Sequence, residues 1–353
     1  MPHTVLLPCA GPLTSATRPH WLLTTPQGEL AIGRAIRSIP ESDIGRVVIG
    51  LSDEADKRFG AGEAIRRCFE DISWPSPDII IIEQATRGPA HTIEVMIERA
   101  GVEGAIAIKD ADSLFTIQSP LPGTSFTVVC DLRENLEIPR VGEKSFVRLN
   151  EQNFVNDIVE KEVSSNLVSV GLYGFADANL FKTHYIAAER ALHSSAIFIS
   201  HVMSSAIDAG EVVIPVTATN YVEVDSNVSW HAFRERHMTL VLDIDGVVFE
   251  NHSRFFPPFW EEEDKPIEAN VNHLLKLQQN GAQLIFMTAR PDKYRQKTLN
   301  ALRKLGIDVH ALITGCNHGR RYLINDFAAS NPYPSATSIN LTRNSPDLPK
   351  MIG

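Results

Sequence analysis

The stretch "LVLDIDGVVFEN", residues 240–251, decides the fold of the C-terminal part of the chain. An apolar run ends in two aspartates two positions apart, Asp243 and Asp245, and Gly246 follows directly. The run predicts a buried strand, and both carboxylates can then point into the crevice at its carboxyl end. There Asp243 can attack a phosphorus atom, while Asp245 protonates the leaving oxygen and later activates water. Gly246 allows a tight turn with no side chain in the way of a phosphate.

Strand and helix patterns alternate downstream of this stretch. The apolar spacing predicts a helix over 267–281, a strand over 282–291, a helix over 293–307 and a strand over 320–328. The pattern restarts after the polar run "HAFRERH", residues 231–237. We therefore predict one domain over residues 1–236 and a second over residues 237–353.

Residues 238 to about 345 resemble the haloacid-dehalogenase-like (HAD) phosphatases, which carry these pieces in this order. The resemblance implies that Thr288 is the phosphate-binding hydroxyl and that Arg320 clamps the phosphate. It also implies that Asp326, at the end of the last predicted strand, joins Asp243 and Asp245 around one Mg²⁺ ion. The other candidates for the phosphate clamp are His318, Arg321 and Lys304.

The sequence departs from the HAD pattern at the last motif, where Asn325 replaces the first of two acids. The interval between Asp245 and Thr288 is short for a large cap domain. We therefore expect a capless HAD-like parallel sheet, whose site a partner domain or a partner subunit closes. A homo-oligomer is one arrangement that would meet this expectation, and the sequence leaves the oligomeric state open.

The N-terminal part also alternates between strand and helix patterns. We predict strands over 3–10, 45–52, 77–84 and 104–115, and helices over 30–39, 53–72 and 89–102. Continuous β-branched runs of this kind are typical of buried parallel strands, so these patterns predict a mostly parallel α/β sheet.

Several stretches together resemble the sugar-phosphate nucleotidyltransferases over residues 4 to about 234. They are "PLTSATRPHWLL" (12–23), "EQATRGPAHTIEVMI" (83–97), "AIAIKDADSLF" (105–115), "DIVEKEVSSNLVSVGLYGFADANLF" (157–181) and "YVEVDSNVSWHAF" (221–233). The resemblance implies an N-terminal nucleotidyltransferase-like mixed sheet, so that the chain would hold two Rossmann-like α/β domains.

The same resemblance implies the roles of individual residues. Mg²⁺ between Asp112 and Asp225 would stabilise the charge that develops when a sugar phosphate attacks the α-phosphorus of a nucleoside triphosphate. Lys161 would hold the sugar phosphate, and Gly88 would lead the turn that faces the base and ribose. Asp110 either assists the metal or caps the end of its strand.

The phosphate loop of the N-terminal part is shorter than in the family. Gly11 runs directly into the Pro-Leu-Thr element without the family's Gly-x-Gly-x-x-Arg loop. His20 stands where the family's Pro-Lys-x-Leu element has its lysine. Histidine is mostly neutral at pH 7 and cannot replace a permanent cation. Arg18 compensates in part, together with the hydroxyls of Thr14, Ser15 and Thr17. We predict that Gly11, Arg18 and Gly88 contact the nucleotide.

These predictions support three hypotheses on function. The chain is a bifunctional enzyme of nucleotide-sugar synthesis for a surface polysaccharide, with a Mg²⁺-dependent sugar phosphatase joined to a nucleotidyltransferase. Alternatively, it is a HAD-like phosphatase whose N-terminal domain is a degenerate, non-catalytic module for sugar or nucleotide binding or for oligomerisation. The third hypothesis is a non-catalytic protein that has lost both sites.

Composition limits the partners of the chain. Its 353 residues carry a formal charge of −10, which argues against a nucleic-acid-binding surface. No apolar run is long enough for a transmembrane helix, and the N-terminus lacks the positive region of a signal peptide. The cysteines at positions 9, 68, 130 and 316 form no CxxC pair, as expected of a cytoplasmic protein with reduced thiols. We expect a sugar phosphate and a nucleoside triphosphate as partners.

Overall fold

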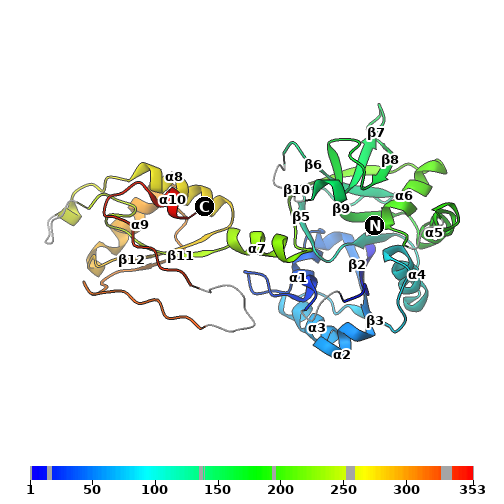
Figure 1. Ribbon diagram of the computed structural model, residues 1–353, viewed down its shortest axis with the longest axis horizontal. Helices are drawn as coiled ribbons and strands as arrows, with labels where there is room; N and C mark the ends of the chain where they lie inside the picture. Colours follow the sequence, from blue (N-terminus) through cyan, green and yellow to red (C-terminus); the bar gives the residue numbers. More distant parts are fainter. Residues whose placement is uncertain are drawn as a thin grey trace. The chain divides into compact units, whose positions relative to one another are not determined.

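The computed structural model describes residues 2–13, 18–134, 138, 140–192, 196–251, 259–326 and 336–352. The chain divides into two compact units, Met1–Phe233 and Arg234–Gly353 (Figure 1). Helix α7 (Asn227–Arg236) runs across this division. Within the described residues, no helix has the length and apolar character needed to cross a membrane.

The described part of the first unit is built on one mixed sheet of ten strands. Eight strands follow the order β3-β2-β1-β4-β9-β6-β10-β5, while β7 pairs with β8 and β9. Strands β3, β2, β1 and β4 are parallel, and β9 is antiparallel to both β4 and β6. Their bounds are β1 His3–Cys9, β2 Ile44–Ser52, β3 Asp78–Ile82, β4 Ile106–Lys109, β5 Ser113–Ile117, β6 Phe126–Asp131, β7 Ser145–Leu149, β8 Val155–Glu160, β9 Leu167–Phe175 and β10 Ile214–Glu223.

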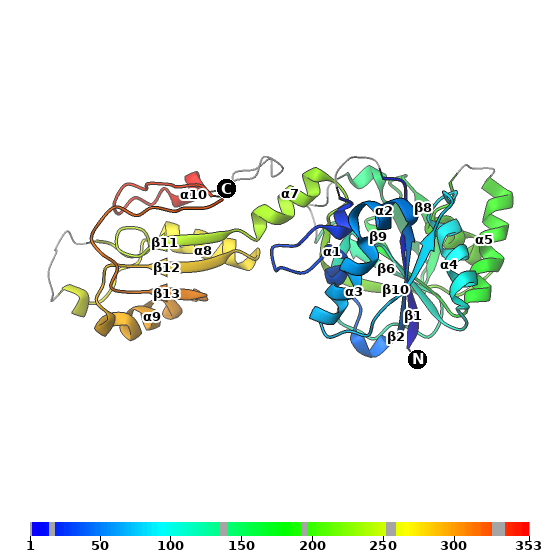
Figure 2. The ribbon, with the colours of Figure 1, turned by 90° about the horizontal axis from the view of Figure 1, so that it is seen from below.

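Helices cover both faces of this sheet (Figure 2). Successive side chains of a strand point to opposite faces, so Val5 and Leu7 of β1 pack in one cluster with α1 and α3, while Leu6 packs with α4, α5 and α6. The helices are α1 Ala31–Ile36, α2 Asp53–Phe59, α3 Ala61–Asp71, α4 Pro89–Ala100, α5 Ala178–Leu192 and α6 Ile199–Asp208; the short 3-10 turns are η1 His20–Leu22, η2 Glu41–Asp43 and η3 Val141–Glu143.

The helix predicted over residues 53–72 is two helices in the structure, so this prediction is wrong in one respect. Gly60 has a φ of +60°, which ends α2 and begins α3. A left-handed residue cannot continue a right-handed helix, and glycine adopts this conformation at the least cost. The predicted strand over 104–115 is also interrupted, because β4 ends at Lys109 and β5 begins at Ser113.

The described part of the second unit contains a parallel sheet of three strands in the order β11-β12-β13. Leu242 of β11, Phe286 of β12 and Leu312 of β13 pack in one core with Leu274 of α8 and Leu302 of α9. The elements are β11 Thr239–Asp243, η4 Phe259–Glu261, α8 Glu268–Gln279, β12 Gln283–Met287, η5 Asp292–Tyr294, α9 Arg295–Lys304, β13 Ala311–Ile313 and α10 Leu348–Met351.

The strand predicted over residues 320–328 is absent from the described part of that range, which ends at residue 326. Tyr322, Leu323 and Ile324 are 76%, 61% and 90% exposed and pair with no strand there. Strand propensity depends on a pairing partner and on burial of one face. The apolar run alone therefore predicted a strand that residues 320–326 do not form.

Candidate active sites

The first candidate site lies where β4 and β10 end. The turn 110–112 follows β4, and the N–H of Val224, just after β10, donates to the carbonyl of Asp112 at 2.8 Å. This bond holds the turn beside the segment that carries Asp225. The pKa of Asp112 is raised, mainly by burial and next by the negative charge of Asp225.

The charges at Asp112 and Asp225 fit a divalent cation. Two carboxylates in a partly buried place provide the hard oxygen donors that Mg²⁺ prefers. The described residues contain no group of three His, Cys, Asp or Glu side chains placed to hold a metal ion. Mg²⁺ bound by this pair would therefore keep water or substrate oxygens among its ligands.

Basic side chains from the segment around η3 neutralise the acids at the end of β10. Arg140 forms an ion pair with Asp225, and Lys144 forms one with Glu223. The other oxygen of Asp225 accepts a hydrogen bond from the hydroxyl of Ser229 at 3.1 Å. Both oxygens of Asp225 are thus engaged by protein groups in this structure.

The residues just before Asp112 carry a second pair of charges, the buried Lys109 and the half-buried Asp110. The Nζ atom of Lys109 donates to the carbonyls of Asp110 at 2.7 Å and of Ser113 at 2.5 Å, so it braces the turn from inside. Burial lowers the pKa of Lys109 to about 8, although Asp110 and Asp112 oppose the shift. Burial, followed by the charge of Asp112, raises the pKa of Asp110 to about 7. The N–H of Asp110 also donates to the carbonyl of Gly171, so this residue ties the turn to β9.

Lys161, predicted to hold the sugar phosphate, follows β8 with a left-handed φ of +58°. Its side chain is exposed, and its Nζ atom lies 4.9 Å from the centre of the Phe198 ring. Its N–H donates to the carbonyl of Lys144 at 2.9 Å. Glu160, its neighbour, instead accepts from the hydroxyls of Ser145 at 2.5 Å and Ser200 at 2.6 Å. The backbone therefore links Lys161 to the segment that neutralises Asp225, and Glu160 is a structural acceptor.

The shortened phosphate loop is described only at its ends. Gly11 and Arg18 are exposed, while Thr14, Ser15 and Thr17 lie outside the described residues. The ring Nε2 of His20 lies 3.2 Å from the side-chain oxygen of Asn227, two residues after Asp225. His20 therefore joins the end of this loop to the segment that carries Asp225.

Gly88 is required by the packing at the start of α4. Its φ is +130°, and an added Cβ would lie 3.0 Å from both the backbone N and O of Ile197. The residue before it, Arg87, forms an ion pair with Glu189 at 2.5 Å. His91 accepts the N–H of Arg87 at its Nδ1 atom, so its ring caps the turn. The structure thus explains Gly88 by close backbone contact with residues 196–197, and its predicted contact with a nucleotide stays a prediction.

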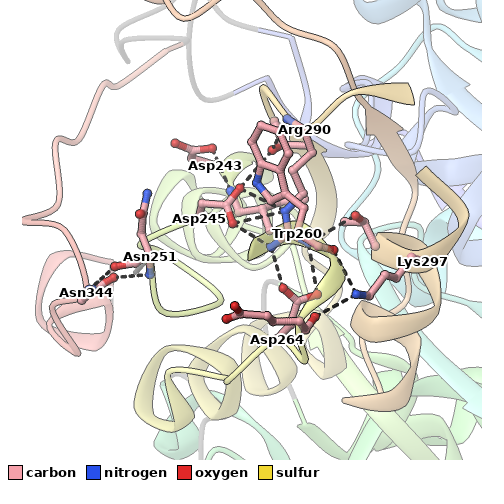
Figure 3. A network of polar contacts seen from close by, with 12 residues as sticks. Asp243, Asp245, Asn251, Trp260, Asp264, Arg290, Lys297 and Asn344 are labelled. Atoms are coloured by element: carbon pink, nitrogen blue, oxygen red, sulfur yellow. Dashed lines mark hydrogen bonds and ion pairs between the residues drawn. The ribbon is translucent and has the colours of Figure 1, made fainter. Parts of the chain in front are cut away.

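The second candidate site lies at the carboxyl end of β11, where Asp243 ends the strand (Figure 3). Its Oδ1 atom accepts the N–H of Ile244 at 2.9 Å, and its Oδ2 atom lies 2.9 Å from Nη1 of Arg321. The Asp243 side chain is 36% exposed, so a ligand can reach it. Arg321, one of the other candidates for the phosphate clamp, forms this ion pair with Asp243. Arg320, the predicted clamp, is exposed and takes part in no ion pair among the described residues.

Asp245 lies in a buried network of charges on the other side of the turn (Figure 3). Nη2 of Arg290 lies 2.6 Å from Oδ1 of Asp245, and Nε lies 3.1 Å from Oδ2. The same guanidinium pairs with Asp264, at 2.7 and 3.1 Å, and is only 2% exposed. Burial lowers the pKa of Arg290, but the bonds to Asp245 and Asp264 outweigh it and raise this pKa overall.

Thr288 is fully buried and belongs to the same network. Its hydroxyl donates to Asp245 at 3.3 Å and accepts the N–H of Arg290 at 3.1 Å. The hydroxyl predicted to bind phosphate is therefore occupied by protein groups in this structure.

Asp326 does not join Asp243 and Asp245 in the structure. It lies in the exposed segment 321–326, and the described residues hold no group of three acids suited to a metal ion. The strand that would have carried Asp326 to the sheet is absent there, which is the physical reason for the difference. In the part of this unit that the structure describes, Asp243, Asp245 and Asp326 do not form the predicted three-acid Mg²⁺ site.

Five charged residues of these sites were missed by sequence reasoning. Arg290 carries a local signal, because it follows the strand end at Thr288 by two positions. The others lie in loops or at strand ends with no motif of their own, and only the contacts reveal them. They are Arg140, Lys144, Glu223 and Asp264.

Comparison with known proteins identifies a similar fold for the first unit. No family model matches the sequence, and no curated protein matches it. Among solved structures, a nucleoside-diphosphate-sugar pyrophosphorylase from Vibrio cholerae RC9 is 16% identical, with a TM-score of 0.54; the match covers 65% of this chain and 99% of that chain. The inositol-1-phosphate CTP transferase from T. maritima is also 16% identical, with a TM-score of 0.49 over 66% of this chain and 95% of that one. The mixed sheet of the first unit therefore has the fold of the Vibrio cholerae pyrophosphorylase.

Proposed function

We propose that the first unit transfers a nucleotidyl group from a nucleoside triphosphate to a sugar phosphate. The observation that carries the proposal is the bond from Val224 to Asp112, which joins Asp112 and Asp225 at the end of the sheet. The nucleoside-diphosphate-sugar pyrophosphorylase fold of this unit supports the same reaction class.

In this reaction an oxygen of the sugar phosphate attacks the α-phosphorus, the bond to the β-phosphate breaks, and pyrophosphate leaves. Mg²⁺ held by Asp112 and Asp225 would stabilise the negative charge that develops on the phosphate oxygens. Lys161 binds the sugar phosphate through its side-chain amino group. The buried Lys109 holds the turn 110–112, and so Asp112, in place.

The test is release of pyrophosphate by the full chain with Mg²⁺, a panel of nucleoside triphosphates and a panel of sugar 1-phosphates. Asp112→Asn and Asp225→Asn are expected to lower the rate by about 10²-fold or more. Asp157→Asn is the matched control, because Asp157 is a partly exposed acid of β8 that pairs with Arg148. Binding of a triphosphate without release of pyrophosphate would favour the alternative, a non-catalytic nucleotide-binding module. Absence of both binding and release would contradict the proposal.

A second candidate function is supported by the contact between Arg321 and Asp243 in the second unit. We propose that this unit hydrolyses a phosphomonoester of a sugar. Asp243 attacks the phosphorus, and the bond to the sugar oxygen breaks as this oxygen takes a proton from Asp245. Water, which gives a proton back to Asp245, then cleaves the aspartyl-phosphate and releases inorganic phosphate. Arg321 offsets the repulsion between the anionic nucleophile and the anionic substrate. Both oxygens of Asp245 accept from Arg290, so proton transfer by Asp245 requires this pair to open.

Hydrolysis is tested on a panel of sugar phosphates, with Asp243→Asn expected to abolish turnover and Asp308→Asn, an exposed acid of the same unit, expected to leave it unchanged. Mass spectrometry of the peptide that carries Asp243 should detect one added phosphoryl group after rapid quenching. Turnover that persists in Asp243→Asn would exclude the aspartyl-phosphate route. With both activities the chain would serve synthesis of an activated sugar, as for a surface polysaccharide.

A further inference from the structure

The basic residue bound to Asp225 raises the question of how a metal ion enters the first site. Arg140 occupies one oxygen of Asp225, and Ser229 donates to the other. A guanidinium on the same carboxylate oxygen as a divalent cation would place like charges side by side. Arg140 and a divalent cation therefore compete for Asp225, and the cation binds most tightly when Arg140 leaves this carboxylate.

Arg140 is free to make this move, whereas the other cations of the cluster are not. Its side chain is 41% exposed, and its remaining ion pair is with Glu143, three residues on, at 3.1 Å. Lys109 is fully buried on two carbonyls, and the side chain of Lys144 is only 8% exposed in its pair with Glu223.

The chain also lacks the arginine-bearing, glycine-rich loop after β1 that the resemblance would place at the triphosphate. Gly11 leads directly into the Pro-Leu-Thr element, and Arg18 is exposed at the far end of that segment. A guanidinium released beside the metal ligands can donate two parallel hydrogen bonds to a phosphate.

We infer that Arg140 exchanges partners: it neutralises Asp225 in the metal-free chain, and it binds the phosphates of the nucleoside triphosphate once Asp225 holds a divalent cation. This inference rests on the proposed nucleotidyl transfer. It assigns to Arg140 the contact with the triphosphate that the arginine of the missing loop would otherwise make. Its two consequences are separable. Arg140 weakens metal binding to the free protein, and it strengthens triphosphate binding to the metal-bound protein.

The experiment measures both affinities in the full chain. Mn²⁺ binding is followed by electron paramagnetic resonance of the free ion, and binding of inorganic tripolyphosphate at saturating Mg²⁺ is followed by calorimetry. The variant is Arg140→Asn, because asparagine tolerates the left-handed φ of +49° at this position. Arg148→Asn is the matched control, since Arg148 is similarly exposed and pairs with Asp157. Thermal melting checks that each variant is folded.

Arg140→Asn is expected to bind Mn²⁺ about fivefold more tightly and tripolyphosphate about tenfold more weakly than the parent chain. Arg148→Asn should change neither affinity. Unchanged or weaker Mn²⁺ binding in a folded Arg140→Asn would overturn the exchange, and unchanged tripolyphosphate binding would overturn the role at the phosphates.

Asp225→Asn separates this inference from the proposed function. Loss of Mn²⁺ binding in Asp225→Asn shows that the measured site is the one described, so the Arg140 result then decides the inference alone. Mn²⁺ binding that survives in Asp225→Asn refutes the metal site itself, and the exchange at Asp225 is refuted with it.

Discussion

Replacement of Arg290 by methionine is expected to open the second unit locally. Arg290 is 2% exposed, and it separates two carboxylates, Asp245 and Asp264, whose side chains are only 16% and 12% exposed. Methionine fills a similar length but leaves both acids without their shared cation. Removing one partner of a buried ion pair costs about 3–5 kcal/mol, because the remaining charge stays desolvated and unpaired. We expect about 3 kcal/mol here, since neither carboxylate is fully buried.

The assay is hydrogen exchange with mass spectrometry on the full chain. Peptides from β12 and α9 report on the second unit, and peptides from β1 and β2 serve as an internal reference in the first unit. A loss of about 3 kcal/mol raises the exchange rate of the β12 and α9 amides by about 10²-fold where local opening limits exchange.

Two further variants separate charge from packing at this position. Arg290→Lys keeps the charge but cannot bond both carboxylates side by side, so its exchange should lie between the parent and Arg290→Met. A triple variant in which Asp245 and Asp264 become asparagine and Arg290 becomes methionine removes all the charges and should recover most of the protection. Exchange in Arg290→Met within about threefold of the parent would refute the reasoning, because the network would then contribute less than about 1 kcal/mol.

Three other predictions concern the first unit. The pKa of Asp110 is raised to about 7 from the 3.8 of a free aspartate, so the folded chain binds this proton more tightly than the unfolded chain does. The midpoint of urea unfolding should therefore fall as the pH rises from about 4 to about 7, and Asp110→Asn should flatten this dependence on pH. In thermal melts, Gly88→Ala should lower the free energy of unfolding by about 1–3 kcal/mol, because the added Cβ meets the backbone of Ile197. Its control is Gly101→Ala, at a φ of +58° with open space around it, which should lower the free energy of unfolding by about 1 kcal/mol. Ser52→Ala removes the side-chain acceptor at the start of α2 and should cost about 1 kcal/mol in urea unfolding, while an unchanged midpoint would show that this cap is not used.

Local pattern predicted most of the helices and strands of this chain, because each depends on spacing within a few residues. The β-branched runs of β1, β2 and β3 and the amphipathic spacing of α4 and α8 were sufficient for that purpose. The strand patterns alone predicted a mostly parallel sheet in the N-terminal part, which is wrong, because β9 is antiparallel to both β4 and β6. The resemblance to the sugar-phosphate nucleotidyltransferases implied a mixed sheet there, and the structure contains one, with the fold of the Vibrio cholerae pyrophosphorylase. The local errors have local causes. A left-handed Gly60 divides a predicted helix, and residues 322–324 meet no strand with which to pair.

The candidate sites depended on tertiary structure, because their partners are distant in sequence. The aspartates of the two motifs could be named from the sequence, since a carboxylate at the end of a buried strand is a local feature. They are 110 and 112 after β4, 243 at the end of β11 and 245 just after it. The cation that neutralises each aspartate could not be predicted from the sequence. Arg140 reaches Asp225 only because the segment around η3 packs beside the end of β10. Asp264 reaches Arg290 only because the segment after η4 lies beside the segment after β12. An ion pair is decided by distance in space and by exclusion of water, and neither of these can be read from the order of residues.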